Sequence, residues 1–354
     1  MKKYVNIYAF GIICFVCLFL PTCKPDKVVC QNCDKKEVIE EINPDLDMVI
    51  DFDLGVIDNC DTFPRPTQGG ISTITEKQNQ RHAPCFNPRN SAEFIYIKQE
   101  GRKLSLVKYN IDKKLEQILI DNTTIIGQPK WGKNGWIVFA QADFQIYLIK
   151  DNGDSLRKVT SFFENNNPSF IGMDRIYFSV GTHTVPGHAG NKIIDFWDKR
   201  IDSIKYLENG VTFALNDVNS RQEACGKSCL NSKNCYIAIR NLKDMSYSIL
   251  NEFEFVGKNS ILGIAWHPNN KNIYYSAFKD GLRMVNRTTK KVVVVRNACD
   301  SKHYTYLNIS PDGKKIIVER VEATDFTAIP GSWTTESKIY MMDYDGKNEK
   351  DVFE

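Results

Sequence analysis

The feature that most constrains how this chain folds is a pattern that recurs six times after residue 86. Each copy has a short run of alternating apolar residues, a polar turn and a second apolar run, which indicates a β-hairpin. Repeats of 40 to 50 residues are typical of propellers and solenoids. The copies cover residues 104–119, 146–160, 193–207, 236–250, 282–295 and 339–353.

Two of the hairpin turns have a sequence that favours a specific backbone conformation. Asn152-Gly153 and Asp345-Gly346 combine a short polar residue with glycine. Both residue types accept the positive φ of two-residue hairpin turns. The turn chemistry therefore agrees with the strand pairing that the apolar pattern predicts.

A second unit precedes most hairpins and consists of a large apolar head residue, a turn and a strongly β-forming strand. In the last copy, Ser310-Pro311-Asp312-Gly313 suits a type I turn. The copy near residues 211–215 is degenerate. The head residues are Phe86, Trp131, Phe170, Trp266 and Ile309.

Together, the two units give four antiparallel strands in each of six repeats. This predicts an all-β fold, a six-bladed β-propeller of four-stranded antiparallel blades. A sandwich or solenoid shares the strand content, but a solenoid needs a shorter and more uniform period. Residues 71–75 and 351–353 compete for the outer strand that closes the sixth blade.

Two segments carry a resemblance to a known family. The sequence SPDGKKI at residues 310–316, followed by IYMMDYDG at residues 339–346, resembles the WD40-like repeat of TolB-type propellers. The resemblance spans most of residues 71–354 and is weakest in the fourth blade. It implies a six-bladed ring and a protein-binding role at the bacterial envelope, although the separate N-terminal domain of TolB has no counterpart here.

The N-terminal residues indicate export. Lys2 and Lys3 precede an apolar run of about 16 residues, which is shorter than the roughly 20 of a transmembrane helix. Cys23 follows this run directly and resembles the acylated cysteine of bacterial lipoproteins. We therefore expect a signal peptide at residues 1–22 and lipidation of Cys23, with ordinary secretion and cleavage elsewhere as the alternative.

The rest of the chain divides into a tether and one domain. Residues 24–47 contain eleven charged residues and only scattered apolar ones, so they cannot bury a core. We expect residues 23–47 to be the anchor and tether, and residues 48–354 to be the propeller. The expected location is the cell envelope, on the periplasmic or cell-surface side of the outer membrane.

Charge and cysteine content narrow the function classes. The net charge of +3 falls to +1 without Lys2 and Lys3, so the chain lacks the basic excess that nucleic-acid binding needs.

In an exported protein, cysteines are expected to form disulfides. Cys225, Cys229 and Cys235 are therefore candidate disulfide cysteines, with a zinc site as the less favoured alternative.

Three long connections between second and third strands are candidate binding loops, at residues 180–191, 216–234 and 321–337. The first holds His183 and His188, which could ligate a metal only if other blades supplied further ligands. A solvated loop is favoured, so we predict no metal and no cofactor. Phe326 and Trp333 in the third loop are candidate aromatic anchors for a partner, or pack on their own domain.

The sequence contains no linear catalytic motif. G-x-S-x-G, H-E-x-x-H and G-x-x-x-x-G-K-[ST] are all missing, and we predict no catalytic residue. The leading hypothesis is a binding propeller that presents one loop-rich face to an envelope protein or glycan. The alternative is a propeller enzyme, a lyase or hydrolase, that acts on polysaccharide.

Overall fold

The computed structural model describes residues 74–76, 78–161, 164–180, 190–195, 201–204, 211–215, 222–227, 234–241, 246–254, 261–277, 281–297, 302–325 and 333–354. The chain divides into the units Met1–Asn43 and Pro44–Glu354, and all described residues belong to the second. The expected signal peptide, Cys23 and the tether lie outside the described residues. In the described part, no helix has the length and apolar character needed to cross a membrane.

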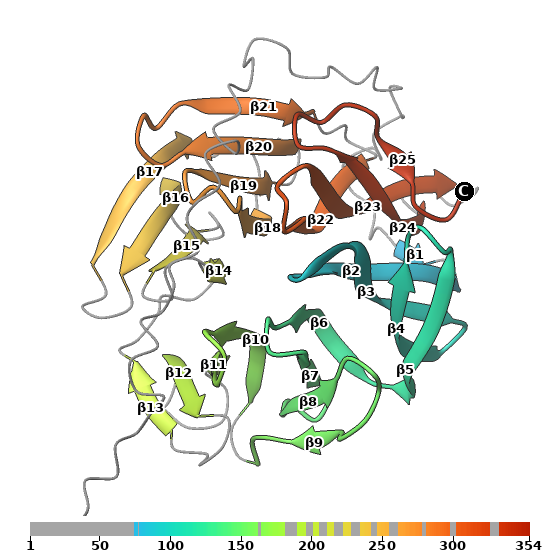
Figure 1. The fold of residues 1–354 in the computed structure, drawn as a ribbon. Helices are drawn as coiled ribbons and strands as arrows, with labels where there is room; N and C mark the ends of the chain where they lie inside the picture. The colour runs from blue at the N-terminus through green and yellow to red at the C-terminus, as the bar shows by residue number, and fades with distance from the viewer. Residues whose placement is uncertain are drawn as a thin grey trace, which may run out of the picture. The chain divides into compact units, whose positions relative to one another are not determined.

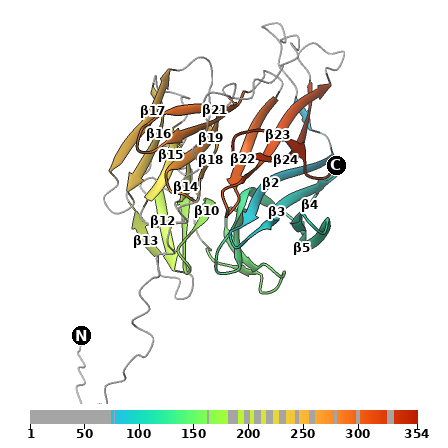
Figure 2. The same ribbon diagram turned by 45° about the horizontal axis from the view of Figure 1, so that its top comes forward.

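The described strands form six separate sheets, five of four strands and one of five. Figure 1 shows these sheets as blades around a common centre, with the first strand of each blade innermost. Figure 2 shows the strands of the labelled blades lying side by side. The predicted all-β propeller of four-stranded antiparallel blades is therefore confirmed.

The blades follow one another along the chain. Blade 1 contains β2 (Asn79–Asn87), β3 (Asn90–Glu100), β4 (Lys103–Asn110) and β5 (Leu115–Thr123); blade 2 contains β6 (Ile125–Trp131), β7 (Trp136–Gln141), β8 (Ile146–Lys150) and β9 (Arg157–Lys158); blade 3 contains β10 (Asn165–Ile171), β11 (Arg175–Val180), β12 (Gly190–Asp195) and β13 (Ile201–Ile204). Blade 4 contains β14 (Val211–Leu215), β15 (Gln222–Lys227), β16 (Asn234–Asn241) and β17 (Tyr247–Glu254); blade 5 contains β18 (Ile261–Trp266), β19 (Asn272–Ala277), β20 (Gly281–Asn286) and β21 (Val292–Arg296). Blade 6 contains β22 (Lys302–Ile309), β23 (Lys315–Asp325), β24 (Trp333–Asp343), β25 (Lys350–Asp351) and β1 (Ile74–Glu76).

The core lies between neighbouring blades. The second strand of a blade has both faces covered, so it reads as a continuous apolar run rather than an alternating one. In β7, residues Ile137, Val138, Phe139 and Ala140 are all fully buried. Ile137 and Phe139 pack against blade 1, while Val138 and Ala140 pack against blade 3.

Two hairpin turns differ from their expected length. Gly153 (φ 95°) and Gly346 (φ 86°) adopt the left-handed conformation that the sequence predicts. In each turn the glycine N–H bonds to the carbonyl three residues earlier, and the pairing closes one residue later. The loops therefore have three residues and need only one left-handed position, which glycine fills.

Both candidate closing segments pair with β24. Ile74 of β1 lies parallel to Trp333, whereas Asp351 of β25 is antiparallel to Tyr340. The two short strands use different halves of the same edge, so the competition expected from the sequence does not arise. Phe353 follows β25 and packs on the aromatic residues Phe94, Tyr96 and Tyr109 of blade 1.

Two of the three expected long loops are shorter than the sequence indicates. Residues 216–234 include a complete strand, β15, between β14 and β16. Strand β23 continues to Asp325 and β24 begins at Trp333, which is a strand residue and not a loop residue as predicted. The prediction failed because backbone pairing extends these strands through residues without an apolar pattern, such as the pair Glu322 and Glu336.

Candidate functional site

The two faces of the ring differ in their connections. We call the face that carries the connections from second to third strands, and from each blade to the next, the loop-bearing face. The opposite face carries the other turns of each blade, and we call it the turn face. His183, His188, Phe326 and Cys229 belong to connections on the loop-bearing face and lie outside the described residues.

Three contacts of described polar side chains on the turn face join neighbouring blades. The contacts are Arg89 Nη2 to Asp151 Oδ2 (2.6 Å), Asn134 Nδ2 to the Met173 carbonyl (2.6 Å), and His267 Nε2 to the Gly313 carbonyl (3.0 Å). They link blade 1 to 2, 2 to 3 and 5 to 6. These three contacts therefore hold neighbouring blades of the propeller together.

A second polar group lies where blade 1 meets blade 6, and we call it the seam cluster: His82, Gln99 and Glu319. Glu319 is buried, and its Oε2 accepts the backbone N–H of Ala83 at 2.8 Å. Its Oε1 lies 3.3 Å from His82 Nδ1, and Gln99 Oε1 lies 3.1 Å from His82 Nε2. Gln99 Nε2 donates to the Gly101 carbonyl, so the amide oxygen faces the histidine, and each ring nitrogen lies beside a side-chain oxygen.

Two further titratable side chains lie within the field of Glu319. Burial lowers the pKa of His303, and the Glu319 charge opposes this shift. Burial raises the pKa of Tyr306, and the Glu319 charge adds to it. Within the described residues, however, no group of three or more His, Cys, Asp or Glu side chains is arranged to hold a metal ion.

Near the ring centre, one amide connects three innermost strands. Gln128 Nε2, from β6, donates to the carbonyls of Pro84 in β2 (2.5 Å) and Tyr306 in β22 (3.1 Å), and Lys130 Nζ donates to Gln128 Oε1. Bulges in β2 and β22 break the ladder at these carbonyls, next to the left-handed residues Ala83 and Tyr306. The innermost strands of blades 1, 2 and 6 are thus fixed to one another.

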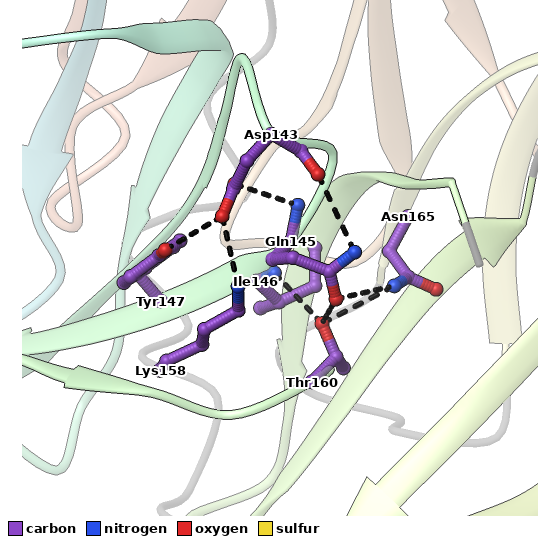
Figure 3. Close-up of polar contacts among 7 residues, drawn as sticks. All are labelled: Asp143, Gln145, Ile146, Tyr147, Lys158, Thr160 and Asn165. Carbon is purple, nitrogen blue, oxygen red and sulfur yellow. Dashed lines mark hydrogen bonds and ion pairs between the residues drawn. The ribbon is translucent and has the colours of Figure 1, made fainter. Parts of the chain in front are cut away.

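A third polar group surrounds the β7–β8 turn on the loop-bearing face (Figure 3). We call it the blade 2 cluster, and its side chains are Asp143, Gln145, Tyr147, Lys158, Thr160 and Asn165. Its buried part is a set of hydrogen bonds. Gln145 Oε1 accepts from Thr160 Oγ1 (2.9 Å) and from Asn165 Nδ2 (3.3 Å), and Thr160 Oγ1 accepts the Ile146 N–H (2.9 Å).

The exposed part of the blade 2 cluster is a charged pair. Asp143 Oδ2 accepts from Lys158 Nζ (2.9 Å) and Tyr147 Oη (2.8 Å). Partial burial acts to raise the pKa of Asp143, but the hydrogen bonds from Lys158 and Tyr147 outweigh it and hold the pKa below its ordinary value. The hydrogen bond to Asp143 also raises the pKa of Lys158, so both groups are charged at neutral pH. Between Asp143 and Gln145 the turn presents Phe144, which is 44% exposed.

The register separates two of the candidate disulfide cysteines. Cys225 lies in β15 and pairs with Ala238 of β16, three positions beyond Cys235. Three strand residues span about 10 Å, whereas a disulfide joins Cα atoms less than about 7 Å apart. This pairing does not bring Cys225 and Cys235 together, and their connection to Cys229 stays a prediction.

Sequence reasoning missed the residues that form these clusters. Glu319 and His82 are 237 positions apart, and only ring closure brings them together. Phe144 did leave a signal, because Asp143-Phe144 stands at a tight turn between two strands, where glycine or asparagine is usual.

The described fold defines a class, the six-bladed β-propellers. No family model matches the chain, and no curated protein sequence does so. The chain does match solved protein structures. TolB from Acinetobacter baumannii is 13% identical with a TM-score of 0.50, and the match covers 60% of this chain and 53% of that one, so the chain spans about half the length of TolB.

Two other solved propellers match over more of the chain. An oligogalacturonate lyase in complex with manganese is 7% identical with a TM-score of 0.51, covering 77% of this chain and 78% of that one. The β-propeller domain of the Trilobed protease from Pyrococcus furiosus is 9% identical with a TM-score of 0.50, covering 78% and 99%. At these identities the likeness concerns the fold alone, and the fold serves both binding proteins and enzymes.

Proposed function

We propose that this chain is a non-catalytic binding protein of the bacterial cell envelope, anchored by a lipid at Cys23, that holds a protein partner against its loop-bearing face. The observation that carries the proposal is the β7–β8 turn of the loop-bearing face. It presents an exposed aromatic ring beside a charged pair, and hydrogen bonds of buried side chains support the turn.

Aromatic residues are enriched at the centres of protein interfaces, and polar groups form the rim around them. The resemblance to TolB-type propellers, which bind envelope proteins, supports the same reading. A glycan ligand is the competing occupant of this face.

Site-specific crosslinking tests which face is used. A benzophenone amino acid replaces Arg102 or Ser161, exposed on the loop-bearing face, or Lys133 or Met173, exposed on the turn face. The full-length protein, produced in its own envelope, should form crosslinks to a defined protein only from Arg102 and Ser161. Crosslinks only from the turn face, or from neither face, would contradict the proposal.

The seam cluster favours a second candidate, a propeller enzyme that acts on polysaccharide. His82, Glu319, His303 and Tyr306 place two imidazoles, a carboxylate and a phenol where blade 1 meets blade 6, and one protein of similar fold is an oligogalacturonate lyase in complex with manganese. Metal analysis and glycan-array binding of the full-length protein separate the two candidates. A stoichiometric metal together with a bound acidic glycan would favour the enzyme.

A further inference from the structure

Six turns of the described chain share one conformation and so can be compared directly. In each, a backbone N–H bonds to the carbonyl three residues earlier, and the donating residue has a positive φ. Four of these residues are glycines and one is an asparagine, which are the residues that this conformation favours. The six donating residues are Gly135, Phe144, Gly153, Asn270, Gly313 and Gly346.

Phe144 departs from the other five in residue type and in location. Its φ is 55°, a region that is sterically unfavourable for a bulky side chain. The other five turns lie on the turn face, whereas the β7–β8 turn lies on the loop-bearing face. Among these six described turns, glycine or asparagine therefore occupies this position in all but the one turn on the loop-bearing face.

The β7–β8 turn is held rigidly although its ring is exposed. The Phe144 N–H donates to the Gln141 carbonyl, and the Phe144 carbonyl accepts from the Asn165 N–H, each at 2.8 Å. Below the turn, Gln145 is fixed by Thr160 and Asn165 (Figure 3). A ring on such a support loses little conformational freedom when it binds, which raises affinity.

We infer that Phe144 is the anchor residue with which the loop-bearing face binds its partner, and that the partner is a protein with an apolar pocket bordered by charged groups. This inference rests on the proposed function and identifies the residue at the centre of the contact. The polar groups beside the ring favour a protein over a glycan. Asp143 already accepts three hydrogen bonds, from Tyr147, from Lys158 and from the Gln145 N–H, so at most about one of its acceptor sites is left for sugar hydroxyls.

A comparison of two variants of the full-length protein separates anchoring from packing. Phe144→Gly removes the ring and accommodates the positive φ, whereas Phe144→Ala removes the ring and keeps a Cβ. We expect the glycine variant to melt no lower than the unchanged protein and above the alanine variant. A Tm lower by more than about 3 °C in Phe144→Gly would show that the ring is kept for packing, and would overturn the inference.

The second measurement is binding of the protein that crosslinks from Arg102 and Ser161, purified on its own. Phe144→Gly and Phe144→Ala should each weaken its affinity at least tenfold, with Met173→Ala, exposed on the turn face, as the matched control. Unchanged affinity would overturn the role of Phe144 while leaving the proposed function intact. Specific binding to a glycan array that Phe144→Gly abolishes would overturn the choice of a protein partner, and absence of loop-face crosslinks would overturn both proposals.

Discussion

At the level of single residues, His267 has its protonation state fixed by its two hydrogen bonds. Its Nε2–H donates to the Gly313 carbonyl at 3.0 Å, and its Nδ1 accepts the Asn269 N–H at 3.2 Å. A second ring proton, on Nδ1, would point at the Asn269 N–H, which is itself a donor. Burial also lowers the pKa of His267, although the hydrogen bond to the Gly313 carbonyl and the Asp312 charge oppose the shift. The ring is therefore neutral in the folded protein.

This makes folding sensitive to acid at His267. The unfolded histidine takes up a proton near pH 6.5, before the folded one does, so the free energy of unfolding falls as the pH drops below about 6.5. In His267→Gln, the slope of that fall should decrease by up to about 1.4 kcal/mol per pH unit. Urea unfolding at several pH values between 7.5 and 5 measures the slope.

A second histidine, His303, provides an internal control for this measurement. His303, whose pKa burial also lowers, remains in the variant and leaves a residual acid sensitivity. If the variant and the unchanged protein gave parallel curves, His267 would not be the group that titrates.

Single residues were also the hardest level to predict from the sequence. The left-handed Ala83 and Tyr306 occur in bulged strands and follow no glycine signal. The Gln128 amide finds its acceptors only after blades 1, 2 and 6 have come together. Contacts of this kind depend on the closed ring, and local sequence does not encode them.

At the level of elements, most of the prediction succeeded because buried strands and tight turns have local signatures. All six expected hairpins are present. The exceptions are β15 and the ends of β23 and β24, where the backbone of polar residues forms the pairing between strands. Sheet neighbours supply the pairing there, so an apolar pattern is not required.

The segment after β25 gives an element-scale prediction. The Phe353 ring lies 4.8 Å from that of Tyr109 and 5.3 Å from that of Tyr96, with the Arg81 guanidinium 3.9 Å from its centre. It therefore packs the last strand of blade 6 against blade 1. Since the ring is partly exposed, Phe353→Ala should lower the free energy of unfolding by about 2 kcal/mol, less than for a fully buried phenylalanine, as measured by urea unfolding.

Leu115→Ala is the matched control for this prediction. Leu115 is a large apolar residue that is 61% exposed on the edge strand β5, and its removal should change stability by no more than about 0.5 kcal/mol. Equal losses in the two variants would mean that Phe353 does not help to close the ring.

At the scale of the whole molecule, the propeller explains how a chain without a linear catalytic motif can build a site from distant residues. The seam cluster joins blade 1 to blade 6, and the blade 2 cluster reaches into the start of blade 3. The fold class was predictable because it follows from repeats. The clusters were not, because each depends on which blades become neighbours.

The proposed function also requires that the propeller be held at a membrane, and Cys23 is the residue that tests this. One acyl chain gives only marginal binding, and the multiple chains of a lipoprotein give stable anchoring. Cys23→Ser should therefore move the protein from the detergent-extracted membrane fraction to the soluble fraction and abolish incorporation of labelled palmitate.

The variant leaves the propeller itself unchanged, so its Tm and its affinity for the purified partner should match those of the unchanged protein. That comparison separates anchoring from folding and from recognition. If Cys23→Ser stayed in the membrane fraction and lost no label, the N-terminal cysteine would not be the anchor. Some other part of the chain, or another protein, would then hold the propeller at the membrane.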